Sequence, residues 1–247
     1  MTLSVKDTVV FAWEQYKKQP LAWLKIIVVA LIVSGLSSYV AQSAIDGGAS
    51  PLLLIPLNIA DFFVQMVVCM AMIYFALRLH DGKDALLSQF LEPIDLMWRY
   101  IGGVIIYGAG VLLGLILLVI PGVIFAIAGG MWPYLLIDKR LGPVEAVKES
   151  LRMTRGNRWQ LLLLAVVLTV LNLVGLIPLG LGLLITVPVS TLAVVHAYRI
   201  LERQAPPTAN QAEHNAGNNR TDKKMSDVIV QVNTKVDVQV AQKASLS

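Results

Sequence analysis

The stretch YIGGVIIYGAGVLLGLILLVIPGVIFAIAGGMWPYLLID, residues 100–138, decides the fold, because it has no charged residue between Arg99 and Asp138. A helix needs about 20 apolar residues to cross the hydrocarbon core of a bilayer, so this stretch is long enough for two crossings. The Ile120-Pro121 pair divides it into residues 100–120 and 122–137. Similar apolar blocks occur at residues 21–41, 56–79, 159–179 and 180–201.

The composition agrees with a membrane protein. Hydrophobic residues make up 56% of the 247-residue chain and charged residues 15%, against about 25% charged in a soluble domain. Backbone polar groups in lipid must be paired within the segment, which favours helices, and the alternating pattern of a strand barrel is absent from the blocks. The sequence therefore predicts an all-α, polytopic transmembrane bundle of about six spans in residues 1–203, followed by a cytoplasmic tail, 204–247.

The basic residues are distributed unequally between the two sides of the predicted bundle. Alternate connections, at residues 42–55, 118–122 and 175–180, contain no Lys or Arg. By the positive-inside rule, both termini are expected in the cytoplasm. The net charge of +4 does not indicate nucleic-acid binding, because the basic residues lie between apolar blocks instead of forming one face.

A similar unit occurs three times, which predicts three helical hairpins, each preceded by an amphipathic helix in the membrane interface. The amphipathic segments are residues 4–19, 84–98 and 143–154. In the first, Ser4 and Asp7 have the spacing of a capping box. In the third, Val144, Val147 and Leu151 are expected to share the apolar face. Ile-Pro recurs at each expected outer turn (residues 55–56, 120–121 and 177–178), and a tyrosine recurs near the end of each returning span (Tyr74, Tyr134 and Tyr198).

Small residues indicate how spans three and four pack. Gly122, Ala126 and Gly130 follow each other at four-residue spacing, as do Gly110 and Gly114. Such ladders allow two helix backbones to approach closely, so we expect the two spans to pack through them. Pro133 predicts a bend or break in the fourth span.

Asn58, Asp61 and Gln65 form a candidate polar site within the second span, since their spacing puts them on one helical face. A carboxylate inside a membrane is costly, which favours an ion or proton site or the wall of a polar cavity. The alternative is that the span begins near Phe62 and that Asp61 is its N-cap.

Three arginines, Arg152, Arg155 and Arg158, precede the fifth span. They are candidate contacts for the headgroups of membrane lipids, anionic ones among them. The alternative is that they only determine topology. No P-loop, H-E-x-x-H, G-x-S-x-G or zinc-cysteine pattern occurs, Cys69 is the single cysteine, and His80 and His196 have no acidic or cysteine neighbour at ligand spacing. No catalytic, cofactor-binding or metal residue is therefore predicted, and we expect no enzyme.

The tail is polar, but valines alternate with polar residues at 228–240, which is a strand pattern. A lone strand is not stable, so this segment either pairs with a partner protein or another copy, or stays unfolded.

Three short motifs carry a resemblance to known families. They are GGMWPYLLID at residues 129–138, G-P-x-E-A-x-x-x-S-L at 142–151 and G-x-x-W at 156–159. The chain resembles, over residues 120–164, the YciC-like UPF0259 proteins and the membrane domain attached to some glycerophosphoryl diester phosphodiesterases. The resemblance implies a helical bundle in the bacterial inner membrane and no catalytic residues, since the phosphodiesterase domain is absent here.

The sequence thus favours a non-enzymatic membrane-organising or lipid-associated protein without a cofactor. The alternative is a small-solute transporter or channel that uses the Asn58, Asp61 and Gln65 face. A third hypothesis is an assembly factor whose tail adds a strand to a partner.

Overall fold

The computed structural model describes residues 3–83, 89, 91–178 and 180–205. The chain divides into two compact units, Met1–Gln204 and Ala205–Ser247. The strand predicted at 228–240 lies outside the described residues. None of the described residues is in a strand, and six helical segments among them are long and apolar enough to cross a membrane. The predicted all-α membrane fold is therefore confirmed at the level of length and composition.

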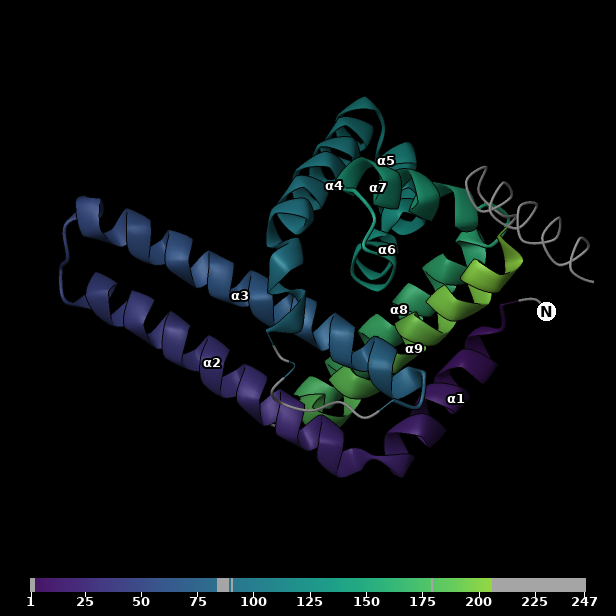
Figure 1. The fold of residues 1–247 in the computed structure, drawn as a ribbon, viewed down its shortest axis with the longest axis horizontal. Coiled ribbons are helices and arrows are strands. Elements are labelled where there is room, and N and C mark those ends of the chain that lie inside the picture. The colour runs from purple at the N-terminus through teal and green to yellow at the C-terminus, as the bar shows by residue number, and fades with distance from the viewer. Residues whose placement is uncertain (1–2, 84–88, 90, 179, 206–247) are drawn as a thin grey trace, which may run out of the picture. The chain divides into compact units, whose positions relative to one another are not determined.

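Figure 1 shows the helices of the first unit. Consecutive helices pair as α2 with α3, α4 with α5, and α8 with α9, which matches the three predicted hairpins. Pro20 and Pro51 lie in the first turns of α2 and α3. Proline lacks a backbone N–H, but in the first turn of a helix that N–H has no acceptor within the helix, so no hydrogen bond is lost. The bounds are α1 Val5–Lys18, α2 Pro20–Asp46, α3 Pro51–His80, the 3-10 helix η2 Glu92–Leu96, α4 Met97–Leu117, α5 Val119–Gly129, α6 Trp132–Lys139, α7 Pro143–Met153, α8 Arg158–Leu176 and α9 Leu183–Gln204.

The repeated Ile-Pro pairs do not occupy equivalent places, which corrects the expectation that each marks an outer turn. Pro56 lies inside α3, because α2 and α3 extend further than their apolar blocks and the turn between them is residues 47–50. Gly48 allows this turn through its positive φ of 69°. Pro121 lies inside α5, and Pro178 follows α8.

The predicted close packing of spans three and four is confirmed. A Cβ added to Gly114 of α4 would lie 2.7 Å from the Cα of Gly122 in α5, so the two backbones are in contact. Gly110 is covered in the same way by the ring of Phe125. Glycine is required at these positions because any side chain would separate the helices.

The fourth span is broken between α5 and α6, as Pro133 predicts, and α7 completes it. The Ser150 hydroxyl of α7 donates to the Ala128 carbonyl at 2.9 Å and accepts from the Met131 amide at 3.1 Å. The Thr154 hydroxyl also donates to Ala128, at 3.0 Å. These hydroxyls pair backbone groups that the break leaves without a helical partner.

The amphipathic segments differ from the expectation in how they are placed. Helix α7 packs on α4, α5 and α6. Its buried residues are therefore Ala146, Val147, Ser150 and Met153. Val144, which was expected on the same apolar face as Val147, is exposed. Within the predicted segment 84–98, residues 92–96 form η2 and not an α-helix, and residues 84–88 and 90 lie outside the described residues.

The first amphipathic helix is confirmed and is packed on α9. Ser4 caps α1 by accepting from the Asp7 amide at 3.4 Å. Thr8 and Ala12 are the buried residues of α1, and the ring of Phe11 stacks on His196 with 3.9 Å between centroids. His196 in turn shares a hydrogen bond of 3.2 Å with His80, a pairing that the sequence did not show.

Candidate functional site

The ends of α3, α6 and α9 meet at one place in the first unit, which we call the charged end. Arg199 of α9 forms ion pairs with Asp81 at 2.6 Å, with Asp138 at 2.7 Å and with Glu202 at 2.9 Å. The Tyr198 hydroxyl also donates to Asp138, at 2.8 Å. A partly buried guanidinium with three carboxylate partners ties these helix ends together, because removal of Arg199 would take this cationic partner from all three carboxylates at once.

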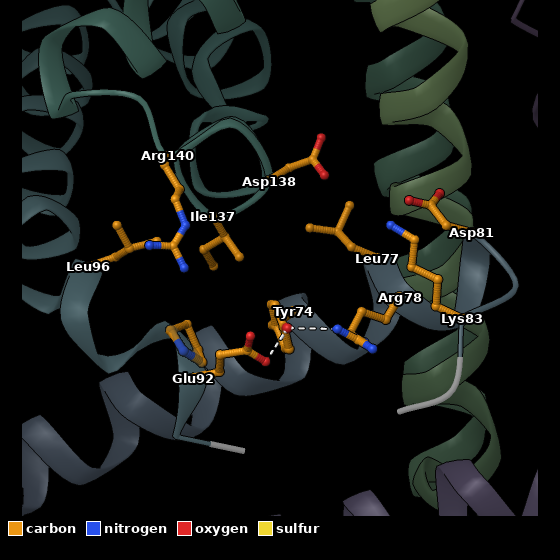
Figure 2. A pocket seen from close by; sticks show the side chains of 11 residues that line it. Tyr74, Leu77, Arg78, Asp81, Lys83, Glu92, Leu96, Ile137, Asp138 and Arg140 are labelled. Carbon is orange, nitrogen blue, oxygen red and sulfur yellow. Dashed lines mark hydrogen bonds between the residues drawn. The ribbon is translucent and has the colours of Figure 1, made fainter. Parts of the chain in front are cut away.

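A pocket of about 240 Å³ lies beside this network and is formed by α3, η2, α6 and the residues after α3 and α6. Figure 2 shows its side chains, with Arg140 extending toward Tyr74 and Glu92, and the Asp138 carboxylate turned away from Arg140. The residues that line it are Tyr74, Leu77, Arg78, Asp81, Lys83, Glu92, Pro93, Leu96, Ile137, Asp138 and Arg140.

The acidic side chains of the pocket already have partners. Asp81 and Asp138 are paired with Arg199. Glu92 accepts from the Tyr74 hydroxyl, which itself accepts from Arg78 Nη1 at 3.0 Å, as the dashed lines in Figure 2 show. The pocket is thus lined by three basic and three acidic side chains, and each acidic side chain already has a partner within the chain.

Two basic residues of the pocket have donors to offer to an anion. Arg140 pairs with Asp95 at 2.7 Å, but both side chains are more than half exposed, so the pair is weak. Lys83 forms no ion pair with any described residue. Guanidinium and ammonium groups around a recess suit a phosphate, to which Arg donates in a bidentate manner.

The backbone fixes the position of Arg140. Its φ is 52°, in the left-handed region that residues other than glycine rarely adopt. The Arg99 guanidinium donates to the Arg140 carbonyl at 2.8 Å and so holds this conformation. Among the described residues, no group of three or more His, Cys, Asp and Glu side chains is placed to hold a metal ion.

The predicted headgroup residues Arg152, Arg155 and Arg158 differ in their surroundings. Arg152 donates to both carboxylate oxygens of Glu149, at 2.8 and 2.6 Å, and these bonds raise its pKa. Arg155 and Arg158 are exposed at the turn between α7 and α8, next to the exposed Trp159.

The predicted polar face of the second span is partly assembled. Asp61 Oδ1 accepts from Gln65 at 3.3 Å and from Ser37 of α2 at 2.7 Å. Asn58 does not join them, because its amide donates to the Leu54 carbonyl of its own helix. Asp61 lies well inside α3, which begins at Pro51, so the interpretation of Asp61 as the N-cap is wrong.

Sequence reasoning missed Arg199, Asp138 and Arg140, whose partners lie far away in the chain. The recurring tyrosines were a usable signal, since Tyr74 and Tyr198 both donate to a carboxylate at the charged end. No comparable pattern in the sequence points to Ser37.

Comparison with known proteins identifies a family. Uncharacterized protein Rv2560 of Mycobacterium tuberculosis is 27% identical over 203 residues, and Uncharacterized protein Mb2590 of Mycobacterium bovis is equally similar. Each alignment covers 73% of this chain, which spans about 60% of the length of these relatives. No solved structure matches the chain.

The family model that matches is described as a protein of unknown function, DUF975. It covers residues 10–205, which include α2 to α9. These matches do not support the more specific resemblance to the YciC-like proteins or to the phosphodiesterase membrane domain. The chain belongs to the DUF975 family.

Proposed function

We propose that this chain is a multi-pass protein of the bacterial inner membrane that binds the phosphate of anionic phospholipid headgroups in the pocket at its charged end, without a catalytic step. Both termini would lie in the cytoplasm. The mycobacterial relatives support a bacterial membrane protein, and the excess of Lys and Arg at the charged end supports a cytoplasmic position for it. The resemblance to the YciC-like and phosphodiesterase-linked families adds no activity to this proposal.

The position of the pocket, at the ends of membrane-length helices, supports a lipid ligand. It lies at the ends of α3 and α6, both of which belong to segments long enough to span a bilayer. Trp98 and Trp159, at the starts of α4 and α8, are 74% and 77% exposed. Exposed tryptophans at helix ends are typical of the headgroup level of a membrane. A headgroup phosphate is the anion that is abundant at this level.

The basic groups of the pocket that are open to a ligand carry the proposal. Arg78, Lys83 and Arg140 line it from the end of α3 and from the residues after α3 and α6, and the carboxylates of Asp81 and Asp138 are both paired with Arg199. A bound phosphate would replace Asp95 as the partner of Arg140 and would also form an ion pair with the ammonium of Lys83. Leu77, Leu96 and Ile137 provide apolar contacts for the glycerol and the first part of an acyl chain.

The test compares two pairs of substitutions that remove the same charge. The variant Lys83→Gln/Arg140→Gln changes the pocket, and Arg155→Gln/Arg158→Gln changes exposed residues outside it. The measurement is the amount of anionic phospholipid retained by protein purified in mild detergent. We expect the pocket variant to retain at least about fivefold less than the exposed variant, since only the pocket variant loses charge-assisted hydrogen bonds to a bound phosphate, each of which contributes at least about 1 kcal/mol. Equal retention by the two variants would contradict the proposal.

A further inference from the structure

The two halves of the α2–α3 hairpin are packed very differently. The buried residues of α3 all lie in its second half, between Met66 and Leu79. In residues 28–65, which we call the distal hairpin, Ala41 is the single buried residue. Leu52 is 86% exposed, and the neighbouring apolar side chains are exposed as well. Apolar exposure alone needs no partner in a membrane, because lipid chains cover it.

The polar side chains of the distal hairpin, in contrast to its apolar ones, are not satisfied by lipid chains. At about 1.5 Å per residue, Asp61 lies roughly 25 Å along α3 from Arg78, which is less than the hydrocarbon thickness of about 30 Å. Ser38 and Asn58, on the same side, are exposed. Lipid chains offer no hydrogen bond to any of them, so this side is poorly matched to lipid.

Only one of the two oxygens of the Asp61 carboxylate accepts hydrogen bonds from the described residues. Oδ1 accepts from Ser37, Ser38 and Gln65, at 2.7, 3.4 and 3.3 Å. Oδ2 accepts from none of the described residues. The amide of Asn58 has a second N–H beyond the one that it donates to Leu54, whereas the Gln65 amide donates to both Ser38 and Asp61. The distal hairpin therefore carries an unused acceptor, Asp61 Oδ2, and an unused donor, on Asn58, on one side.

We propose that two copies of this chain associate in the membrane through the distal hairpin, where Asp61 of each copy faces the Asn58 amide of the other. A two-fold interface brings the same patch against itself, so it requires donors and acceptors in one patch, and this patch has both. Gly35 of α2 adds room for the approach, because a Cβ there would meet no atom within 4 Å. Small residues of this kind allow close helix contact between membrane proteins.

The first experiment measures association directly. Single-molecule photobleaching in liposomes, at increasing lipid dilution, gives the dimer fraction of the full chain. Gly35→Leu should weaken dimerisation at least about tenfold, because the new side chain occupies the contact. Gly108→Leu on α4 is the matched control, since Gly108 also has no atom within 4 Å, and it should leave the dimer fraction unchanged.

The second experiment tests the polar contact. Asp61→Leu should weaken dimerisation about threefold to tenfold, the range expected for loss of one interhelical hydrogen bond in lipid. In a Cys69→Ser background, Gly35→Cys should be joined between copies by a short bismaleimide, and Leu112→Cys, 62% exposed on α4, should not. A wild-type chain that is monomeric at all dilutions, or equal effects of Gly35→Leu and Gly108→Leu, would overturn the proposal.

Discussion

The block α4–α7 and the hairpin α2–α3 are both built from membrane-length helices, but different contacts hold them together. In the block, the backbones of Gly114 and Gly122 touch, and the hydroxyls of Ser150 and Thr154 are buried against a broken helix. In the distal hairpin, the two helices share the cluster of Asp61 with Ser37 and Ser38, and every residue except Ala41 is at least partly exposed. The difference indicates that backbone contact fixes the geometry of the block, whereas the hairpin depends on polar side chains.

The largest effect is expected where backbones touch. Gly114→Val should lower the free energy of unfolding by about 3 kcal/mol, because the added atoms meet the backbone of α5, which cannot move aside as a side chain could. Gly108→Val is the control on the same helix, with open space around it. Equilibrium unfolding in mixed detergent micelles measures both, and equal losses would show that the glycine contact does not hold the block.

An intermediate effect is expected at the broken span. Ser150→Ala removes the partner of the Met131 amide and one partner of the Ala128 carbonyl in a buried place, so unfolding free energy should fall by about 2 kcal/mol. Ser43→Ala is the matched control, because the Ser43 hydroxyl is exposed and bonds only to the Val40 carbonyl of its own helix. The same unfolding measurement should detect little change for it.

The smallest effect is expected in the hairpin. Ser37→Ala removes one 2.7 Å bond to Asp61, while Ser38 and Gln65 remain as donors. The loss should be about 0.6 kcal/mol, the average for an interhelical hydrogen bond in a membrane. A loss as large as that of Ser150→Ala would mean that the two regions are not held differently after all.

The sequence was sufficient for the features that depend on neighbours in the chain. Apolar blocks predicted the membrane-length helices, and the spacing of Gly110, Gly114 and Gly122 predicted the contact of α4 with α5. Pro133 predicted the broken span. These features follow from helix periodicity and from the space that a side chain needs, both of which can be read locally.

The candidate site could not be predicted in the same way. Arg199 is paired with Asp138 and Asp81, which precede it by 61 and 118 residues, and no local pattern connects them. Ser150 and Thr154 looked like ordinary polar positions of an amphipathic helix, because nothing nearby shows that the fourth span lacks bonding partners. The pair of Arg152 with Glu149, in contrast, follows from their i, i+3 spacing on one helix and is present.

The completion of the fourth span by α7 has a consequence for biosynthesis. The hydroxyls of Ser150 and Thr154 are translated after residues 119–139, which they stabilise. While those residues leave the ribosome, the amide of Met131 and the carbonyl of Ala128 have no helical partner, so release into lipid is unfavourable. We therefore expect the fourth span to leave the insertion machinery for lipid only after α7 has emerged, so that the two segments integrate together.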